Sequence, residues 1–288
     1  SADGPSPAYE ALRQSLRELG YTEGRNIAFE YRSTNDHARL TEMAKELVGS
    51  KIDVIVAQGG TSAAVAKSAT KEIPIIFAHS GDPIEAGFVA SIARPGGNMT
   101  GMTFLAYELL GKRLELLKEV VPKVSRVAVL SNPAHNGEQR ELKETQSVAH
   151  SLKIALAYQQ VRDQTDFDGA FEATVKANAN GILVFPEAVT LSHAKRIAEF
   201  AVKHKLPTIF GWHEYVDTGG LMSYGPNRVQ TYKRIAVFVD KVLKGTKPAD
   251  IPVELPLKWE LVFNLKAAKQ IGLTIPPNVL VRADRVIK

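Results

Sequence analysis

The sequence predicts an α/β fold of two doubly wound parallel-sheet lobes, and three observations lead to it. Residues 53–57 and 73–78 are almost continuously apolar, which is typical of strands covered on both faces. Strand patterns alternate with helix patterns along most of the chain, as in folds built on parallel sheets. The alternations are too numerous for one compact sheet of ordinary width, and the organisation repeats after Leu105. We therefore expect two similar lobes.

The chain is expected to cross between the lobes three times. Residues 1–103 and 224–263 then form the first lobe, and residues 104–223 and 264–288 form the second. In open parallel sheets, ligands bind at the carboxyl ends of the strands. Facing strand ends of the two lobes would therefore enclose a ligand cleft.

The first lobe opens with a helix, predicted over residues 8–19 by its apolar stripe and ended by Gly20. An alternating fold normally begins with a strand, so we expect a first strand to be missing before this helix. Residues 26–32 alternate apolar and polar side chains as a strand does, and a helix is expected over residues 40–50.

Two strand-loop-helix units follow in the first lobe. The strand over residues 53–57 leads to a small-residue helix over 63–70. The strand over residues 73–78 leads to a helix that is expected to begin near Ile84. Their two loops are expected to lie side by side at the carboxyl edge, where helix N-terminal amides point at an arriving polar group.

The second lobe repeats the alternation. Its strands are expected at residues 126–130, 154–160, 181–185 and 207–210, and the strands over 220–224 and 261–264 lie at the second and third crossings. Its helices are expected at residues 108–120, 138–152, 166–177, 191–204 and 265–271, and a long helix over 229–243 belongs to the first lobe.

Composition narrows the function classes. The 288 residues are 44% hydrophobic and 23% charged, which is typical of a folded globular protein. The net charge of +5 is scattered, and no basic cluster interleaves with aromatic residues, so nucleic acid is not an expected partner. Cysteine is absent, which excludes disulfides and thiolate chemistry. No apolar run reaches the length of a membrane span, and no signal peptide stands at Ser1.

Motifs for cofactors, metals and nucleophiles are missing. No Gly-x-Gly-x-x-Gly fingerprint or phosphate-binding Gly-x-x-x-x-Gly-Lys loop follows a strand. The seven histidines include no His-Glu-x-x-His spacing, and there is no Gly-x-Ser-x-Gly elbow. The sequence therefore predicts neither a cofactor nor a metal site.

The candidate ligand contacts of the first lobe lie in its two carboxyl-end loops. Gly60, Thr61 and Ser62 read either as a polar cradle at a helix N-terminus or as a tight turn in which Thr61 or Ser62 caps the helix. His79 and Ser80 are candidates after the next strand. Asp82 precedes Pro83 and is expected at least to cap the following helix.

The second lobe offers further candidates at its strand ends. Trp212 follows a buried strand, where it is either core packing or a flat face on which a ligand ring stacks. His213 lies beside it and is either a ligand contact or an exposed loop histidine. The remaining candidates are four residues of other loops, one at the end of an expected strand and one in the first helix: Asn132, His135, Asn136 and Glu187, then Tyr224, then Tyr9.

An ordered set of short motifs resembles a known family. The motifs are Asp82-Pro83, Gly96-Gly97-Asn98 with Thr100-Gly101, Asn132-Pro133, residues 247–253 and residues 261–266. In this order, from about Ala8 to Ile275, they are similar to the substrate-binding proteins of ABC importers that include the tryptophan, tyrosine and phenylalanine binders.

The resemblance implies a type I periplasmic-binding fold with ligand held in the cleft, export from the cytoplasm, and delivery to an ABC permease in the membrane. It implies ligand contacts from the loops at Gly60 to Ser62, at Ser80 and Asp82, and at Asn132 to Gly137. It also implies a first strand before the first helix. We expect a monomer that binds an aromatic amino acid or an aromatic or other organic acid.

The chain departs from the family at two positions. Family members that bind amino acids typically carry Asp-Asn where this chain has Glu187-Ala188, and an acidic residue where it has Trp212. Burying an unpaired ammonium group is costly, so Glu187 is expected to pair with one if the ligand carries it.

Two alternatives stay open on the sequence. One is a small-substrate α/β enzyme that uses His79 and Asp82 as an acid-base pair. The other is the effector domain of a repressor with this fold, which requires a helix-turn-helix before Ser1.

Overall fold

The computed structural model describes residues 7–34, 37–135 and 137–288 and divides into two compact units. Unit 1 comprises residues 1–105 and 228–257, and unit 2 comprises residues 106–227 and 258–288. The sequence placed the last two crossings inside β8 (Met222–Pro226) and near the end of β9 (Trp259–Asn264). In the structure both strands lie wholly in unit 2, because they pair antiparallel with each other.

Unit 1 is built on a three-stranded parallel sheet in the order β1-β2-β3. The strands are β1 (Ile55–Gln58), β2 (Ile75–His79) and β3 (Met99–Thr103). Two helices far apart in sequence, α1 (Pro7–Glu18) and α10 (Arg228–Leu243), pack together in one core cluster with Ile76 and Ala78. The alternate side chains Ile75 and Phe77 face a second cluster with α3 (Gly60–Ala69). The remaining elements are α2 (His37–Gly49) and the short 3₁₀ helix η1 (Pro248–Asp250).

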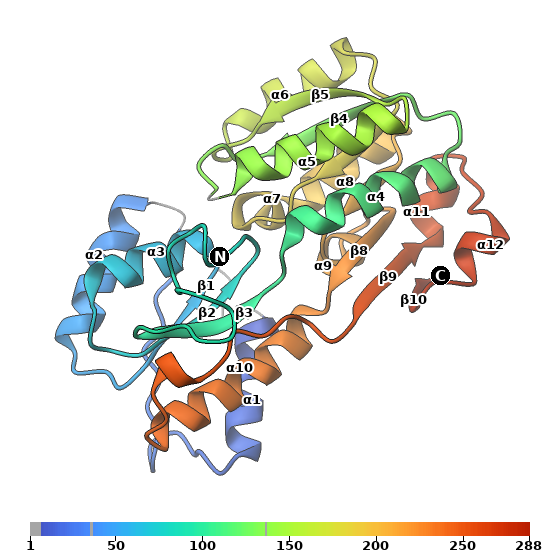
Figure 1. Ribbon diagram of the computed structural model, residues 1–288. Coiled ribbons are helices and arrows are strands. Elements are labelled where there is room, and N and C mark those ends of the chain that lie inside the picture. The colour runs from blue at the N-terminus through green and yellow to red at the C-terminus, as the bar shows by residue number, and fades with distance from the viewer. Residues whose placement is uncertain (1–6, 35–36, 136) are drawn as a thin grey trace. The chain divides into compact units, whose positions relative to one another are not determined.

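Unit 2 is built on a seven-stranded sheet in the order β10-β9-β8-β7-β6-β4-β5, parallel except between β8 and β9 (Figure 1). The further strands are β4 (Arg126–Ser131), β5 (Ala155–Gln160), β6 (Gly181–Val184), β7 (Thr208–Phe210) and β10 (Arg285–Ile287). Its helices are α4 (Ala106–Val120), α5 (Glu138–Ser151), α6 (Asp166–Lys176), α7 (Ala188–Ser192), α8 (Ala194–Lys203), α9 (His213–Asp217), α11 (Leu265–Gln270) and α12 (Pro277–Leu280).

Alternation along the central strands of unit 2 explains its layers. Ala128 and Leu130 share a core cluster with α6 and α8, so these helices cover one face of the sheet. On the opposite face, α4 and α5 pack against each other. The central strands β4 and β6 are buried throughout, apart from Arg126, as their apolar runs predict.

Two predicted elements of unit 1 are wrong. Residues 26–32 form only an isolated bridge between Glu23 and Ile27, since no strand pairs with this segment in the described part of the chain. Its alternation reflects packing instead, because Ile27 and Phe29 lie against the core cluster of α1 and α10. The expected helix near Ile84 is a run of turns, and Gly87, with φ of 67°, turns the chain before a helix propagates.

One predicted helix of unit 2 is divided. Residues 191–204 were expected to form a single helix, but α7 and α8 are separated at His193, whose φ and ψ of −110° and 18° are not helical.

Candidate functional site

The two candidate loops of unit 1 are neighbours because β1 and β2 are paired. Gln58 lies opposite Ala78 in the parallel register, and the Gly59 amide donates to the Ala78 carbonyl at 2.8 Å. This pairing continues past the end of β1. It brings the residues that begin α3 beside those that follow β2, as the sequence predicted for one carboxyl edge.

The first of these loops is a helix start without a side-chain cap. Gly59 is the N-cap of α3, with φ of 89°, and no side chain caps the helix there. The interpretation of Thr61 or Ser62 as the N-cap is therefore wrong. Gly60 is buried, and Thr61 and Ser62 are partly exposed in the first turn of α3. Their hydroxyls and the first amides of α3 together form a donor-rich helix end.

The second loop is held by buried contacts. His79 and Ser80 are 1% and 7% exposed, and the His79 ring lies edge-on to Phe88 with 5.1 Å between centroids. The Thr103 hydroxyl donates to the Gly81 carbonyl at 2.6 Å, which ties the loop to β3. Asp82 Oδ1 accepts from the amides of Ile84 and Glu85 at 2.8 and 3.3 Å. Asp82 thus caps the turns that follow it.

Tyr9 lies on α1 in an aromatic group of unit 1. Its ring centroid is 4.8 Å from that of Tyr31 and 6.3 Å from that of Phe29. The Arg13 guanidinium lies 5.8 Å from the same centroid. Burial raises the pKa of Tyr9, although the Arg13 charge opposes the shift. The ring is therefore held by protein contacts on a partly exposed surface.

In unit 2 the predicted residues share one sheet edge. The strands β4, β6, β7 and β8 are consecutive neighbours and all parallel, so the residues after their carboxyl ends lie in a row. Asn132 and His135 follow β4, Glu187 follows β6, and Trp212 follows β7. Tyr224 lies within β8, and its side chain is partly exposed. Asn136 lies outside the described residues.

The loop after β4 is internally bonded. Asn132 is 8% exposed, and its Oδ1 accepts from the Ala134 amide at 3.0 Å. The buried His135 ring places Nε2 3.7 Å from Oε1 of Glu141. Burial lowers the pKa of His135, but the carboxylates of Glu141, Glu187 and Glu138 more than offset it, so the pKa is raised.

The Glu187 side chain caps the start of α7. Its Oε2 accepts from the Val189 amide at 2.7 Å, and Thr190 completes a capping box at the start of α7. The Thr190 hydroxyl also lies 2.7 Å from Oη of Tyr215, which joins α7 to α9. The Glu187 carboxylate therefore stabilises a helix end at the edge of the sheet.

Trp212 is the N-cap residue of α9 and is 8% exposed. Its ring is stacked near Tyr215, with centroids 6.2 Å apart, inside the core cluster that α6 and α8 cover. Core packing is therefore part of its role.

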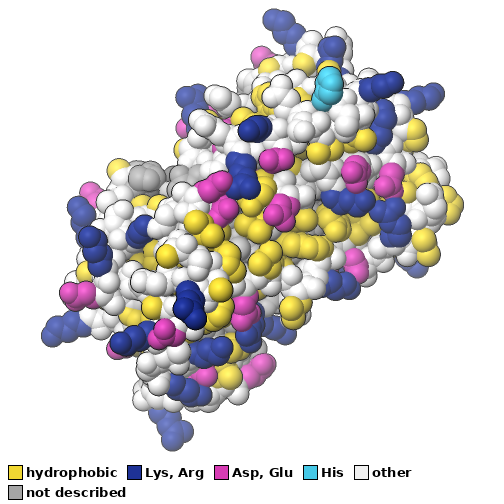
Figure 2. All heavy atoms as spheres, viewed as in Figure 1, with side chains coloured by type: hydrophobic (Ala, Val, Ile, Leu, Met, Phe, Trp, Pro, Cys, Tyr) yellow, Lys and Arg dark blue, Asp and Glu magenta, His cyan; other side chains and the backbone are white. Residues whose placement is uncertain are grey.

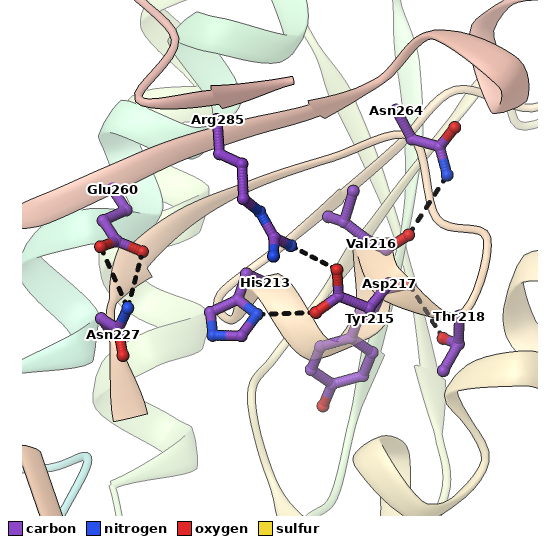
Figure 3. A network of polar contacts seen from close by, with 9 residues as sticks. All are labelled: His213, Tyr215, Val216, Asp217, Thr218, Asn227, Glu260, Asn264 and Arg285. Atoms are coloured by element: carbon purple, nitrogen blue, oxygen red, sulfur yellow. Dashed lines mark hydrogen bonds and ion pairs between the residues drawn. The ribbon is translucent and has the colours of Figure 1, made fainter. Parts of the chain in front are cut away.

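A polar network fastens α9 (Figure 3). His213 Nδ1 lies 2.8 Å from Oδ2 of Asp217, and Arg285 of β10 pairs with the other oxygen of that carboxylate. Asn264 Nδ2 donates to the Val216 carbonyl at 3.2 Å. His213 therefore anchors the short helix that follows Trp212.

Sequence reasoning missed Arg113 of α4. Its side chain is fully buried, and Nε donates to the Tyr224 carbonyl at 2.8 Å. Burial lowers the pKa of Arg113 to about 10, and the nearby charge of Glu141 opposes this shift. A signal was present, because Arg113 follows Leu110 by three residues and precedes Leu117 by four, which puts a cation on the apolar stripe of the helix.

Among the described residues, no group of three or more His, Cys, Asp or Glu side chains could hold a metal ion. No helix within the described ranges is both long enough and apolar enough to cross a membrane.

Two α/β units with parallel sheets, each carrying polar loops at the carboxyl edge of its strands, define a protein of the periplasmic-binding class. Residues 1–287 match the model of the ABC transporter substrate binding protein family, and the chain belongs to this family. It is a substrate-binding protein, and the enzyme alternative finds no support in the family or its relatives. Proteins of this family are extracytoplasmic.

Similar proteins include binders of aromatic amino acids. A tyrosine-binding protein of Clostridioides difficile is 26% identical over 267 residues, which cover 92% of this chain and 76% of that protein. The crystal structure of an ABC domain from Streptococcus pneumoniae in complex with L-Trp has a TM-score of 0.89 and 26% identity, over 98% of this chain and 94% of that one. A conserved domain protein from Vibrio cholerae has a TM-score of 0.91 and 30% identity, over 98% and 96%.

Proposed function

We propose that this protein binds a small aromatic amino acid, or an aromatic or other organic acid, and delivers it to an ABC permease. The observation that carries the proposal is the pair of relatives that bind tyrosine and L-Trp, at 26% identity over more than nine-tenths of this chain. A non-catalytic role agrees with the local tasks of His79 and Asp82, which serve as core packing and as a turn cap.

Unit 1 would supply neutral hydrogen-bond donors to the ligand. Thr61, Ser62 and Ser80 present hydroxyls at the neighbouring ends of β1 and β2, and α3 adds its first amides, beginning at Gly60. Helix N-termini favour anionic groups, which suits a carboxylate. His79 and Asp82 would shape the same edge, and Tyr9 would contact the apolar part of the ligand.

Unit 2 would complete the shell from its own strand ends. Asn132, His135 and Asn136 follow β4, and Glu187 begins α7 beyond β6. Trp212, after β7, and Tyr224, in the neighbouring strand β8, would supply rings for an aromatic ligand.

A thermal-shift screen tests this function. Tyrosine, tryptophan, phenylalanine and the corresponding deaminated acids are added to the purified protein, with glucose as a control ligand. A true ligand at about a hundredfold excess over its Kd stabilises the protein by about 2.7 kcal/mol. The proposal of an aromatic ligand fails if none of these compounds raises the unfolding temperature.

The proposed partners follow from the family. We propose that the protein is exported, acts as a monomer beside its permease, and does not bind nucleic acid. On the face drawn in Figure 2, Lys and Arg side chains are interspersed with Asp and Glu, which supports the last point. Size-exclusion chromatography with light scattering tests the monomer, since a dimer would double the mass of 31.4 kDa.

A further inference from the structure

Arg113 and Glu141 are the most deeply buried charged side chains among the described residues of unit 2. They are 0% and 2% exposed. Burying an ionised group is expensive unless hydrogen bonds replace those lost to water. These hydrogen bonds are only partly replaced. In the parts of the chain that the structure describes, Nη1 and Nη2 of Arg113 and Oε2 of Glu141 have no hydrogen-bond partner.

The guanidinium is oriented at the sheet edge. Its Nε donates to the Tyr224 carbonyl of β8 at 2.8 Å, which leaves the two terminal nitrogens for another acceptor. A Cβ atom at Gly211 would lie 3.0 Å from Nη2, and one at Gly225 would lie 3.4 Å away. Two glycines therefore leave room for the guanidinium at the carboxyl ends of β7 and β8.

Glu141 belongs to the same edge. It lies in the first turn of α5, which follows the loop after β4, and its Oε1 faces Nε2 of His135 at 3.7 Å. The helix that carries it, α5, packs against α4, which carries Arg113, and its charge opposes the lowering of the Arg113 pKa, although the two side chains form no ion pair within 4 Å among the described contacts. The two opposite charges are thus near each other, and each has hydrogen-bonding capacity to spare.

We propose that Arg113 binds the carboxylate of the ligand and Glu141 binds its ammonium group, so that the ligand is an α-amino acid. A guanidinium fork matches a carboxylate, and an ionised glutamate accepts from an ammonium group. This inference rests on the proposed function and deepens it, because it selects the amino acid over the deaminated acid. It also moves the ammonium contact from Glu187, whose carboxylate caps α7, to Glu141.

Three ligands that differ only in their carboxylate and ammonium groups distinguish the proposed roles of Arg113 and Glu141. L-Tryptophan carries both groups, indole-3-propionic acid lacks the ammonium, and tryptamine lacks the carboxylate. Binding of each is measured by calorimetry to the unmodified protein and to Arg113→Met and Glu141→Gln. Arg282→Met is the control, because Arg282 pairs at 2.6 Å with Glu119 on the surface of the same unit.

The expected pattern is selective. Truncating one partner of a buried charge pair weakens binding by about 100-fold or more. Arg113→Met should therefore weaken tryptophan and indole-3-propionic acid by that factor and leave tryptamine unchanged. Glu141→Gln should weaken tryptophan and tryptamine and leave the acid unchanged, while the control retains all three affinities. Equal effects of either variant on all three probes would show that the two charges only neutralise each other, and would overturn the inference.

The unmodified protein decides the question if a variant does not fold. It should bind tryptophan at least about 100-fold more tightly than either analogue; equal binding of tryptamine refutes the role of Arg113. Arg113→Lys keeps the charge without the fork and should cost about tenfold for the two carboxylates. If only a non-aromatic amino acid binds and Arg113→Lys weakens it, the inference stands while the proposed aromatic ligand falls. If no amino acid binds but indole-3-propionic acid does, the inference falls while the proposed function stands.

Discussion

The carboxyl edges of the two sheets differ in the chemistry that they offer. The edge of unit 1 carries neutral hydroxyls and helix amides, and its one candidate carboxylate, Asp82, is engaged as a cap. The edge of unit 2 buries Arg113, Glu141 and His135 close to one another. Neutral donors suit many polar ligands, whereas buried opposite charges suit few. Under the proposed function, unit 1 would contribute general affinity and unit 2 would contribute ligand selectivity.

Trp212 provides the largest expected effect on the charged edge. Because it is 8% exposed in a core cluster, Trp212→Ala should lower the free energy of unfolding by about 3–5 kcal/mol. Denaturant unfolding measures this loss. Trp212→Phe keeps an aromatic ring and should cost less.

The same substitution tests stacking on a ligand. Trp212→Ala should weaken an aromatic ligand more than His213→Ala does, because His213 is engaged by Asp217 at 2.8 Å. Equal losses of affinity would contradict the stacking role and leave core packing alone.

In each unit, a glycine lies so close to a neighbouring backbone carbonyl that a methyl group would not fit. A Cβ atom at Gly101 would lie 2.0 Å from the Phe77 carbonyl oxygen in unit 1, and one at Gly225 would lie 1.8 Å from that of Gly211 in unit 2. Either alanine variant should therefore cost about 3 kcal/mol of unfolding free energy. Gly169→Ala is the control, since nothing lies within 4 Å of its added Cβ in α6, and it should stabilise by about 0.5–1 kcal/mol. If Gly101→Ala or Gly225→Ala lowered the free energy of unfolding by no more than an ordinary surface substitution does, the close backbone contact would be contradicted.

Substitutions of Asp82 test whether its carboxylate only caps the turns that follow it or also contacts the ligand. Asp82→Ala should cost about 1 kcal/mol, because the amides of Ile84 and Glu85 lose their acceptor. Asp82→Asn keeps that acceptor and should be close to the unmodified protein in denaturant unfolding. Calorimetry with the ligand completes the test. Weaker binding by Asp82→Asn at unchanged stability would give unit 1 a charged ligand contact and remove the contrast between the edges.

Much of the fold could be predicted because buried parallel strands have a distinct apolar pattern. The runs that became β1, β2, β4 and β6 were recognisable for this reason. Residues 26–32 were misread because alternation shows that one face is buried, and does not show whether a neighbouring strand exists. The loop residues could be named from their position after strands. Their hydrogen bonds could not, since capping by Asp82 and Glu187 depends on local backbone geometry. Arg113 could not be placed from its position after a strand, because it lies on the buried face of the helix α4.

His135 provides the smallest expected effect, as a dependence of stability on pH. Its folded-state pKa is raised, because nearby Glu141, Glu187 and Glu138 outweigh the lowering that burial causes. A raised pKa means that the folded protein holds the proton more tightly than the unfolded chain, whose histidine titrates near about 6.5. The stabilisation is therefore fully present below that pH and is lost as the pH rises through the folded-state pKa. Denaturant unfolding between pH 5.5 and 8.5, in steps of about half a unit, should show stability falling over this window, and His135→Gln should remove that part of the slope. If the free energy of unfolding of the variant depended on pH with the same slope, the carboxylates around His135 would not act on its pKa. The proposed electrostatic difference between the two sheet edges would then be contradicted.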